Sequence, residues 1–353
     1  MIPRRASSPS RTTTTRSAAS DGSQLGRITR TPEGASGPIT LTRRELVGAA
    51  AALASVSTFG LTSTVAASQV EGLPVPVEVV PLPPQAPVTE GLLDAAGARL
   101  WYWDTGGKGE PTVLLHPATG SGATWGYQQP VLAKAGYRVI GYSRRGHFRS
   151  IITDADVDAS DLEDLRALIG QLGLTRFHLI GSAAGSFLAA QYAVTYPQHL
   201  ATLVLSSSLI GIQDKDYQDL IGRVVPPSFA MLPPEFRELG PSYRTANPEG
   251  TAQWITLEKT ARLAGPSAPR PTSVGRDIVT FENLAALKVP MLLLTGDCDL
   301  YACPALLVYI ARRLGRSAIA VIENAGHAAF WEQPEAYNKT VRDFLEQHRY
   351  QPS

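Results

Sequence analysis

Cysteine is scarce in this sequence, and its two copies form neither a metal motif nor a redox motif. Cys298 and Cys303 lie five residues apart and belong to no CxxC pair. Structural zinc sites and disulfide frameworks draw on paired or more numerous cysteines. We therefore expect no metal site and no disulfide, and we interpret both cysteines as packing residues.

An excess of charge of one sign is also missing. Lys and Arg number 32 and Asp and Glu number 31, which leaves a formal net charge of +1 at pH 7. A balanced surface offers no field that would concentrate a polyanion, so no nucleic-acid partner is expected. The sequence also lacks a phosphate-binding loop, a dinucleotide fingerprint and a metal-ligand cluster, so we expect no cofactor.

The sequence does contain a large apolar fraction. Hydrophobic residues make up 44% of the chain and charged residues 18%, which is typical of a globular protein with a substantial core. Once the first part of the chain is set aside, roughly 280 residues remain, enough for one large domain with an inserted cap. No feature specifies an oligomeric state.

Residues 1–67 are predicted to be a disordered leader that ends in an export signal. Residues 1–40 are rich in Ser, Thr, Arg, Gly and Pro and show no apolar periodicity. Arg43 and Arg44 then precede an apolar, alanine-rich run that ends at Ala67, where a cleavage point is expected. This pattern resembles a twin-arginine signal. It implies a periplasmic or extracellular protein with no stable membrane association after cleavage.

Two alternatives remain open for this leader. Because the apolar run is near the length that spans a bilayer, a single membrane anchor is one of them. Its Ala, Ser, Thr and Gly content makes the run only weakly hydrophobic on insertion scales, which favours the cleaved signal. A cytoplasmic location is the other alternative.

Residues 68–95 are predicted to form a tether between the leader and a folded domain over 96–353. The segment is rich in proline, which favours extended polyproline conformations. The prolines concerned are Pro74, Pro76, Pro81, Pro83, Pro84 and Pro87.

From residue 98 onward, short apolar runs alternate with helical patterns, which predicts a parallel sheet wound with helices in an α/β fold. The expected strands are Arg99–Trp103, Thr112–His116, Arg138–Tyr142, Phe177–Gly181, Thr202–Ser206, Met291–Thr295 and Ala318–Ile322. The expected helices include Asp161–Leu172, Gly185–Tyr196 and Pro304–Leu314. The alternation breaks over about 212–281, a proline-rich stretch with scattered aromatics, which we interpret as a helical cap inserted over the carboxyl edge of the sheet.

One short segment carries the most specific motif in the chain. Residues 181–185 read GSAAG and follow an expected strand. They are in register with the Gly-x-Ser-x-Gly nucleophile elbow of the α/β-hydrolase family, which the chain resembles from residue 98 to its end. The glycines fit a sharp strand-to-helix turn whose flanking side chains would collide. In this register Ala183 occupies the position of the family's serine nucleophile.

Two later segments extend the resemblance to an acid and a base. Residues 292–299 read LLLTGDCD, and residues 326–334 read GHAAFWEQP. By resemblance, Asp299 is the acid and His327 the base, in the family's chain order of elbow, acid and histidine. An aspartate in this role fixes the imidazole tautomer and stabilises its protonated form. Asp297 stays open as an alternative acid.

The turn after Thr112–His116 resembles the family's oxyanion turn. It reads HPATGS from residue 116, and Trp125 follows. The resemblance implies that the backbone N–H groups of Ala118 and Ala184 bind the oxyanion. We expect His116 and Trp125 at the pocket, with His116 either a hydrogen-bonded scaffold or a proton shuttle.

A second turn departs from the family pattern at two positions. Residues 143–150 read SRRGHFRS and resemble Asp-x-Arg-Gly-x-Gly-x-Ser, with Ser143 and Phe148 as replacements. Arg144, Arg145 and His147 are therefore interpreted either as groups at the pocket rim that bind an anionic substrate, or as a solvated turn.

Alanine at the elbow leaves the function open between two classes. A methyl group cannot attack a carbonyl carbon, and loss of a triad nucleophile typically costs on the order of a millionfold in turnover. Ser182, or less readily Ser186, could substitute. Otherwise the His–Asp pair would act through water on a small ester, lactone or activated carbonyl compound. The alternatives are a non-catalytic binding protein and an engineered serine-to-alanine variant.

Overall fold

The computed structural model describes residues 79–225, 227–262 and 279–351. The leader and export signal predicted over 1–67, and the first part of the tether, lie outside the described residues. Within the described residues, no helix is long and apolar enough to cross a membrane.

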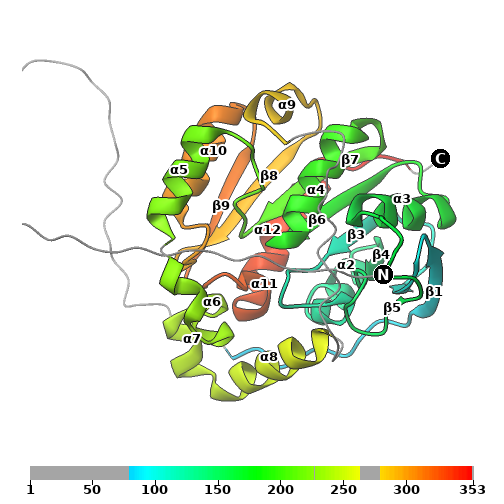
Figure 1. Ribbon diagram of the computed structural model, residues 1–353. Coiled ribbons are helices and arrows are strands. Elements are labelled where there is room, and N and C mark those ends of the chain that lie inside the picture. Colours follow the sequence, from blue (N-terminus) through cyan, green and yellow to red (C-terminus); the bar gives the residue numbers. More distant parts are fainter. Residues whose placement is uncertain (1–78, 226, 263–278, 352–353) are drawn as a thin grey trace, which may run out of the picture. The chain divides into compact units, whose positions relative to one another are not determined.

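A nine-stranded, mostly parallel sheet forms the centre of the domain (Figure 1). Its order is β1-β2-β4-β3-β6-β7-β8-β9, with β5 paired to β2. Strands β3, β4 and β6 to β9 are parallel, whereas β1, β2 and β5 add antiparallel pairings at one side. The strands are β1 Thr89–Ala95, β2 Ala98–Asp104, β3 Pro111–Leu115, β4 Arg138–Tyr142, β5 Ile151–Ile152, β6 Phe177–Ser182, β7 Leu200–Ser206, β8 Met291–Gly296 and β9 Ala318–Ile322. All seven expected strands are present, and the predicted α/β fold is confirmed.

The sheet begins earlier than the predicted domain start at residue 96. Strand β1 pairs antiparallel with β2 from Thr89 to Ala95, inside the range predicted to be tether. The preceding residues are also attached, because Gln85 donates to the Gly126 carbonyl and Gln129 exchanges hydrogen bonds with Ala86. No apolar alternation marks this strand, since only Leu93 of its seven residues is buried.

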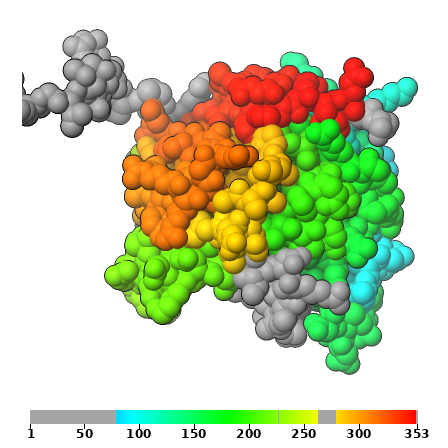
Figure 2. All heavy atoms as spheres, turned by 90° about the horizontal axis from the view of Figure 1, so that it is seen from above, coloured from blue at the N-terminus to red at the C-terminus, as the bar shows by residue number. Residues whose placement is uncertain are grey.

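Helices cover both faces of the sheet. One face carries α3 (Asp161–Gln171), α4 (Ala184–Thr195), α9 (Phe281–Ala286) and α10 (Pro304–Leu314), whose apolar side chains share one core cluster. The other face carries α2 (Gln129–Lys134), α11 (Ala329–Glu332) and α12 (Pro334–Glu346), which share a second cluster. In Figure 2, the red segment that contains α12 lies along one side of the molecule.

Among the described residues, four α-helices lie after β7 and before α9, in the interval of about 212–281 in which the sequence predicts a cap. They are α5 (Lys215–Val224), α6 (Pro234–Glu238), α7 (Pro241–Ala246) and α8 (Pro248–Ala261). Helix α5 packs beside α10, where the rings of Tyr217 and Tyr309 stack. Helices α6, α7 and α8 gather at the opposite end of the molecule (Figure 1). Short 3-10 turns complete the fold: η1 Gly122–Trp125, η2 Pro197–His199 and η3 Pro227–Met231.

Candidate active site

The turn between β6 and α4 has the sharp geometry that its glycines predict. Ala183 forms the bend with φ 50° and ψ −114°, a conformation that L-residues rarely adopt. A Cβ on Gly181 would overlap the Gly185 carbonyl, and a Cβ on Gly185 would overlap the Leu115 carbonyl of β3. The glycines are therefore required by close backbone approach. Ala183 and Ala184 are partly exposed, whereas the residues on either side are buried.

Asp299 and His327 are brought together from the ends of two other strands. Asp299 follows β8 and His327 follows β9, so both lie at the same carboxyl edge of the sheet as Ala183. Nδ1 of His327 lies 2.9 Å from each carboxylate oxygen of Asp299. Asp297, the alternative acid, is exposed and accepts instead from the Ala325 N–H.

Four donors, His327 among them, hold the Asp299 carboxylate in place. They include the backbone N–H groups of Tyr301 and Ala302, which donate to Oδ1 at 2.8 and 2.9 Å. The Thr295 hydroxyl donates to Oδ2 at 2.9 Å, and His327 is the fourth. Burial alone would raise the pKa of Asp299, but His327 and these hydrogen bonds lower it, so the carboxylate stays ionised.

The surroundings of His327 favour its protonated form. Burial lowers the pKa of the imidazole, but the carboxylates of Asp299 and Glu238 outweigh it and raise the pKa to about 9. The ring of Tyr301 also lies against the imidazole, with centroids 4.3 Å apart. At neutral pH the site therefore holds an imidazolium whose Nε2–H can donate a proton.

Glu238 is a site residue that sequence reasoning missed. It ends the cap helix α6 and is only 5% exposed. Its carboxylate accepts hydrogen bonds from the hydroxyls of Tyr301, at 3.2 Å, and Thr119, at 3.4 Å. Burial raises the pKa of this carboxyl, and His327 opposes that effect. No motif marks a glutamate within a cap, so only the folded arrangement reveals it.

Glu332 is a second buried carboxyl near the histidine, with a structural role. Its oxygens accept the backbone N–H groups of Gly240, at 2.7 Å, and Gly326, at 2.9 and 3.0 Å. Burial raises the pKa of this carboxyl to about 8. Through these hydrogen bonds, Glu332 links the start of α7 to the loop that carries His327.

Neither serine weighed as a substitute for the missing nucleophile is available. Ser182 is fully buried as the last residue of β6, a strand buried at every position, which counts against it as the substitute nucleophile. Ser186 is also fully buried. Its hydroxyl donates to the carbonyls of Gly181 and Ser206 and accepts from the Ser206 N–H, so it holds the turn together.

The predicted oxyanion turn follows β3, with Ala118 partly exposed. His116 in this turn is fully buried. Its Nε2 accepts from the Arg144 N–H at 3.0 Å, and its Nδ1 lies 2.7 Å from the Pro117 carbonyl oxygen. The proton therefore sits on Nδ1. Burial holds the pKa of His116 well below its usual range. His116 is a hydrogen-bonded scaffold, which leaves it neither a proton shuttle nor a pocket residue.

Trp125 also lies in the core, where only 1% of it is exposed. Its ring packs against Phe330, with centroids 5.0 Å apart. The placement of Trp125 at the pocket is therefore corrected, because the 3-10 turn η1 directs its side chain inward.

The arginines of the second turn are structural. Arg145 forms a bidentate ion pair with the buried carboxylate of Asp164, at 2.7 and 2.6 Å. Arg144 pairs with Asp161 at 3.3 Å and donates to the His116 and Pro117 carbonyls. Burial lowers the pKa of His147 to about 4, so it is neutral. Both interpretations of this turn, as a rim for anions and as a solvated loop, are wrong for the two arginines.

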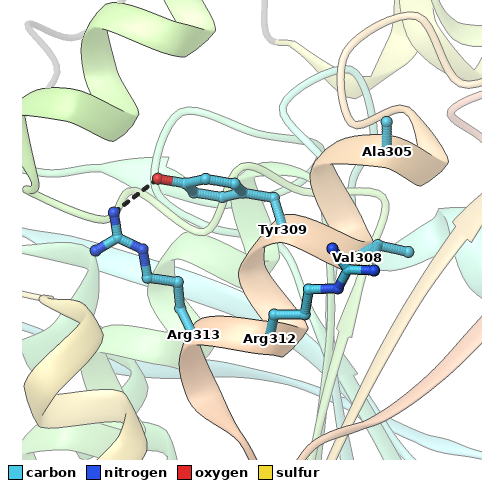
Figure 3. Close-up of a pocket in the computed structure, with 5 residues that line it drawn as sticks. All are labelled: Ala305, Val308, Tyr309, Arg312 and Arg313. Carbon is cyan, nitrogen blue, oxygen red and sulfur yellow. Dashed lines mark hydrogen bonds between the residues drawn. The ribbon is translucent and has the colours of Figure 1, made fainter.

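Within the described ranges, no group of three His, Cys, Asp or Glu residues could hold a metal ion. A hollow of 470 Å³ lies on the outer side of α10, lined by Tyr309, Arg313 and their neighbours (Figure 3). Tyr309 and Arg313 are hydrogen-bonded to each other there. The residues of the carboxyl edge described above do not line it.

The sequence profile of the alpha/beta hydrolase family matches residues 112–340, which include the elbow, the aspartate and the histidine. The chain belongs to this family. Among curated alpha/beta hydrolase relatives, a proline iminopeptidase of Lactobacillus helveticus is 27% identical over 297 residues, which cover 74% of this chain and 99% of that protein. A 2-hydroxy-6-oxononadienedioate/2-hydroxy-6-oxononatrienedioate hydrolase of Pseudomonas putida is 26% identical over 283 residues, 74% of this chain and 95% of that protein.

Solved structures agree with the alpha/beta hydrolase fold. A thermophilic esterase from Thermogutta terrifontis superposes with a TM-score of 0.60 at 24% identity, covering 75% of this chain and all of that one. A bromoperoxidase from Bacillus anthracis gives a TM-score of 0.60 at 22% identity, covering 73% and 100%. At these identities the structures support the fold alone.

Proposed function

We propose that this protein is a hydrolase that cleaves a small ester, lactone or activated carbonyl compound without a serine nucleophile. The observation that carries the proposal is the His327–Asp299 hydrogen bond at the carboxyl edge that also carries Ala183. A catalytic pair kept in working geometry beside a position that cannot form an acyl intermediate favours direct attack by water. The partly exposed Ala118 and Ala184 would offer their backbone N–H groups to the developing oxyanion.

The protonation state of His327 determines whether it acts as an acid or as a base in the proposed reaction. An imidazolium cannot accept a proton from water, but its Nε2–H can protonate a leaving oxygen. Asp299 holds the ring through Nδ1 and stabilises its positive charge, which is the role of the aspartate in a triad. His327 would thus serve as the acid of the reaction at neutral pH.

The relatives support a hydrolase of small molecules. The Pseudomonas putida protein is named as a hydrolase of a dienedioate, and the Lactobacillus helveticus protein as an iminopeptidase. Both proteins align with this chain over nearly their whole length. Their named activities are therefore informative for the complete domain of this chain. The resemblance favours a substrate with a carbonyl group.

The test is an activity screen over esters and lactones with wild type, Ala183→Ser and His327→Gln. We expect slow wild-type turnover with no covalent intermediate in the mass spectrum, and at least a tenfold loss in His327→Gln. Ala183→Ser should hydrolyse esters at least about 100-fold faster and accumulate an acyl-enzyme, since a triad nucleophile is worth far more than this. Its gain should grow above pH 9, where His327 becomes a neutral base. Wild-type activity that is unchanged in His327→Gln would contradict the proposal.

A second candidate is a binding protein that kept the pocket after losing its nucleophile. The methyl group of Ala183 favours it. In that case a ligand found by calorimetry should bind His327→Gln as tightly as wild type, and no compound in the screen should be turned over. Measured turnover by the purified wild type would exclude this candidate.

We also propose that the protein is exported. The support is the arginine pair Arg43 and Arg44 ahead of an apolar run. Replacing both with lysine should leave uncleaved protein in the cytoplasm, as followed by cell fractionation. Normal export of that variant would contradict a twin-arginine route.

A further inference from the structure

Glu238 joins three separate parts of the site. It lies at the end of α6, and its carbonyl oxygen accepts the N–H of Ala328, the residue after the catalytic-site histidine, at 2.9 Å. Its carboxylate contacts Thr119 in the oxyanion turn and Tyr301 in the loop that carries Asp299. Tyr301 is oriented in turn by Arg237, which donates to the phenol oxygen at 2.8 Å. The cap thus places a carboxylate at the centre of the catalytic loops.

The Glu238 carboxylate keeps free capacity to accept hydrogen bonds. An ionised carboxylate has about four acceptor positions, and among the described residues Glu238 receives one hydroxyl donor on each oxygen. Asp299 instead receives four donors, with His327 reaching both of its oxygens. Glu332 is committed to two backbone N–H groups. Glu238 and Glu332 thus each receive two donors, fewer than Asp299, and the donors to Glu238 are side-chain hydroxyls rather than backbone N–H groups.

We propose that Glu238 is the general base of this site and takes the proton of the attacking water in place of a serine and its histidine. This inference rests on the proposed hydrolase function. As the water oxygen bonds to the carbonyl carbon, its proton passes to Glu238 and the carbonyl electrons move to the oxygen. When the intermediate collapses, the bond to the leaving oxygen breaks and His327 protonates that oxygen. The proton on Glu238 then returns to the neutral imidazole, which restores the site.

The charged groups around Glu238 and His327 suit a reaction in which Glu238 accepts a proton and His327 donates one. His327 faces Asp299 and Tyr301 from the loop after β8, Glu238 from α6 and Glu332 from α11. These carboxylates raise the pKa of His327, whereas burial raises the pKa of Glu238 towards the pH at which a base works best. The two directions suit the proposed roles, because a higher pKa makes the Glu238 carboxylate a stronger base and keeps a proton on His327 to donate.

The direct test compares Glu238→Gln with Glu235→Gln, the same change on the same helix. We expect Glu238→Gln to lower kcat/KM by about 100-fold or more, the usual contribution of a general base, and Glu235→Gln to leave it within twofold. Glu238→Asp should keep part of the activity. A Glu238→Gln variant that keeps wild-type kcat/KM would overturn the proposal.

Chemical rescue separates a base from a merely structural residue. Glu238→Ala should recover activity in proportion to added formate, because formate can fill the space and accept the proton, and His327→Ala should not. Folding is checked by circular dichroism and thermal melting. Absence of rescue in a folded Glu238→Ala variant would overturn the role of Glu238.

Different experimental results would contradict the hydrolase proposal and the assignment of Glu238 as the base. No turnover of any ester or lactone by wild type would overturn the hydrolase proposal together with the base. Wild-type turnover that depends on His327 but not on Glu238 would overturn the base alone. NMR titration of the imidazole gives a readout without substrate: the pKa of His327 should fall in Glu238→Gln and stay unchanged in Glu235→Gln.

Discussion

Ala183 carries a methyl group in a backbone conformation that residues with a Cβ rarely adopt. Its φ of 50° and ψ of −114° belong to a region that glycine enters freely. Such strain costs on the order of 1–3 kcal/mol and persists at sites where the surrounding structure imposes it. The elbow has therefore kept its strained geometry in a chain that lacks the hydroxyl it normally presents.

Ala183→Gly should consequently stabilise the protein. Relief of the strain exceeds the entropy that glycine adds to the unfolded chain, for a net gain of about 1 kcal/mol in the free energy of unfolding. Urea denaturation measures it. The control Ala252→Gly, at an exposed position inside α8, should lose about 1 kcal/mol instead. A loss of stability in both variants would show that Ala183 is unstrained.

The protonation of His327 should also appear in the stability of the protein. Its pKa of about 9 in the folded state lies above the ordinary value of 6.5. The imidazolium therefore contributes fully below about pH 6.5, and this contribution is lost as the pH rises through 9. Urea unfolding of wild type and His327→Gln at pH 6 and pH 9.5 should show the wild-type advantage shrinking at the higher pH.

Glu332 titrates in the same direction and is coupled to His327, so the difference between the two proteins reports the histidine together with its effect on Glu332. An advantage that grew with pH would mean that the histidine is buried in its neutral form.

At the scale of elements, the turn after β4 is anchored to α3 by an ion pair. Arg145 and Asp164 are almost wholly buried and bonded through two nitrogens and two oxygens. Arg145 also donates to the Ala96 carbonyl, between β1 and β2. Arg145, which the sequence pattern placed at the pocket rim, thus holds together the turn after β4, helix α3 and the connection between β1 and β2.

Arg145→Met should destabilise the protein by about 3–5 kcal/mol, because it leaves the Asp164 carboxylate buried without its partner. The double variant Arg145→Met with Asp164→Leu should recover much of this loss. Thermal and urea unfolding measure both. Equal losses in the single and double variants would show that packing, rather than the unpaired charge, sets the cost.

Elements with a strong pattern of apolar and terminal residues could be predicted from the sequence, whereas elements with a weak pattern could not. Helix α10 begins at Pro304 and ends at Leu314 as predicted, because a proline at its start and a glycine at its end mark both bounds. Strand β1 escaped detection because it buries a single leucine and follows a run of prolines. The chemistry of His116 also depended on a partner 28 residues away, the Arg144 N–H, which no local pattern contains.

At the level of the complete domain, the chain order of elbow, acid and histidine predicted both the fold and the contact between Asp299 and His327. Parallel strands end at one edge of a sheet, so residues that follow them converge wherever the loops are short. The cap obeys no such rule. Glu238, from the cap, therefore could not be placed in the site from sequence, although it changes the expected protonation of the histidine.

Three hydrogen bonds join the cap to the segment around His327: Ala328 N–H to the Glu238 carbonyl, Gly240 N–H to Glu332, and the Trp331 indole to the Gly250 carbonyl. Helices α6 to α8 cannot swing outward without breaking these bonds or dragging the imidazole with them. A rigid outward movement of these helices would also displace the loop that carries His327, so the position of the cap and the geometry of the His327–Asp299 pair are coupled.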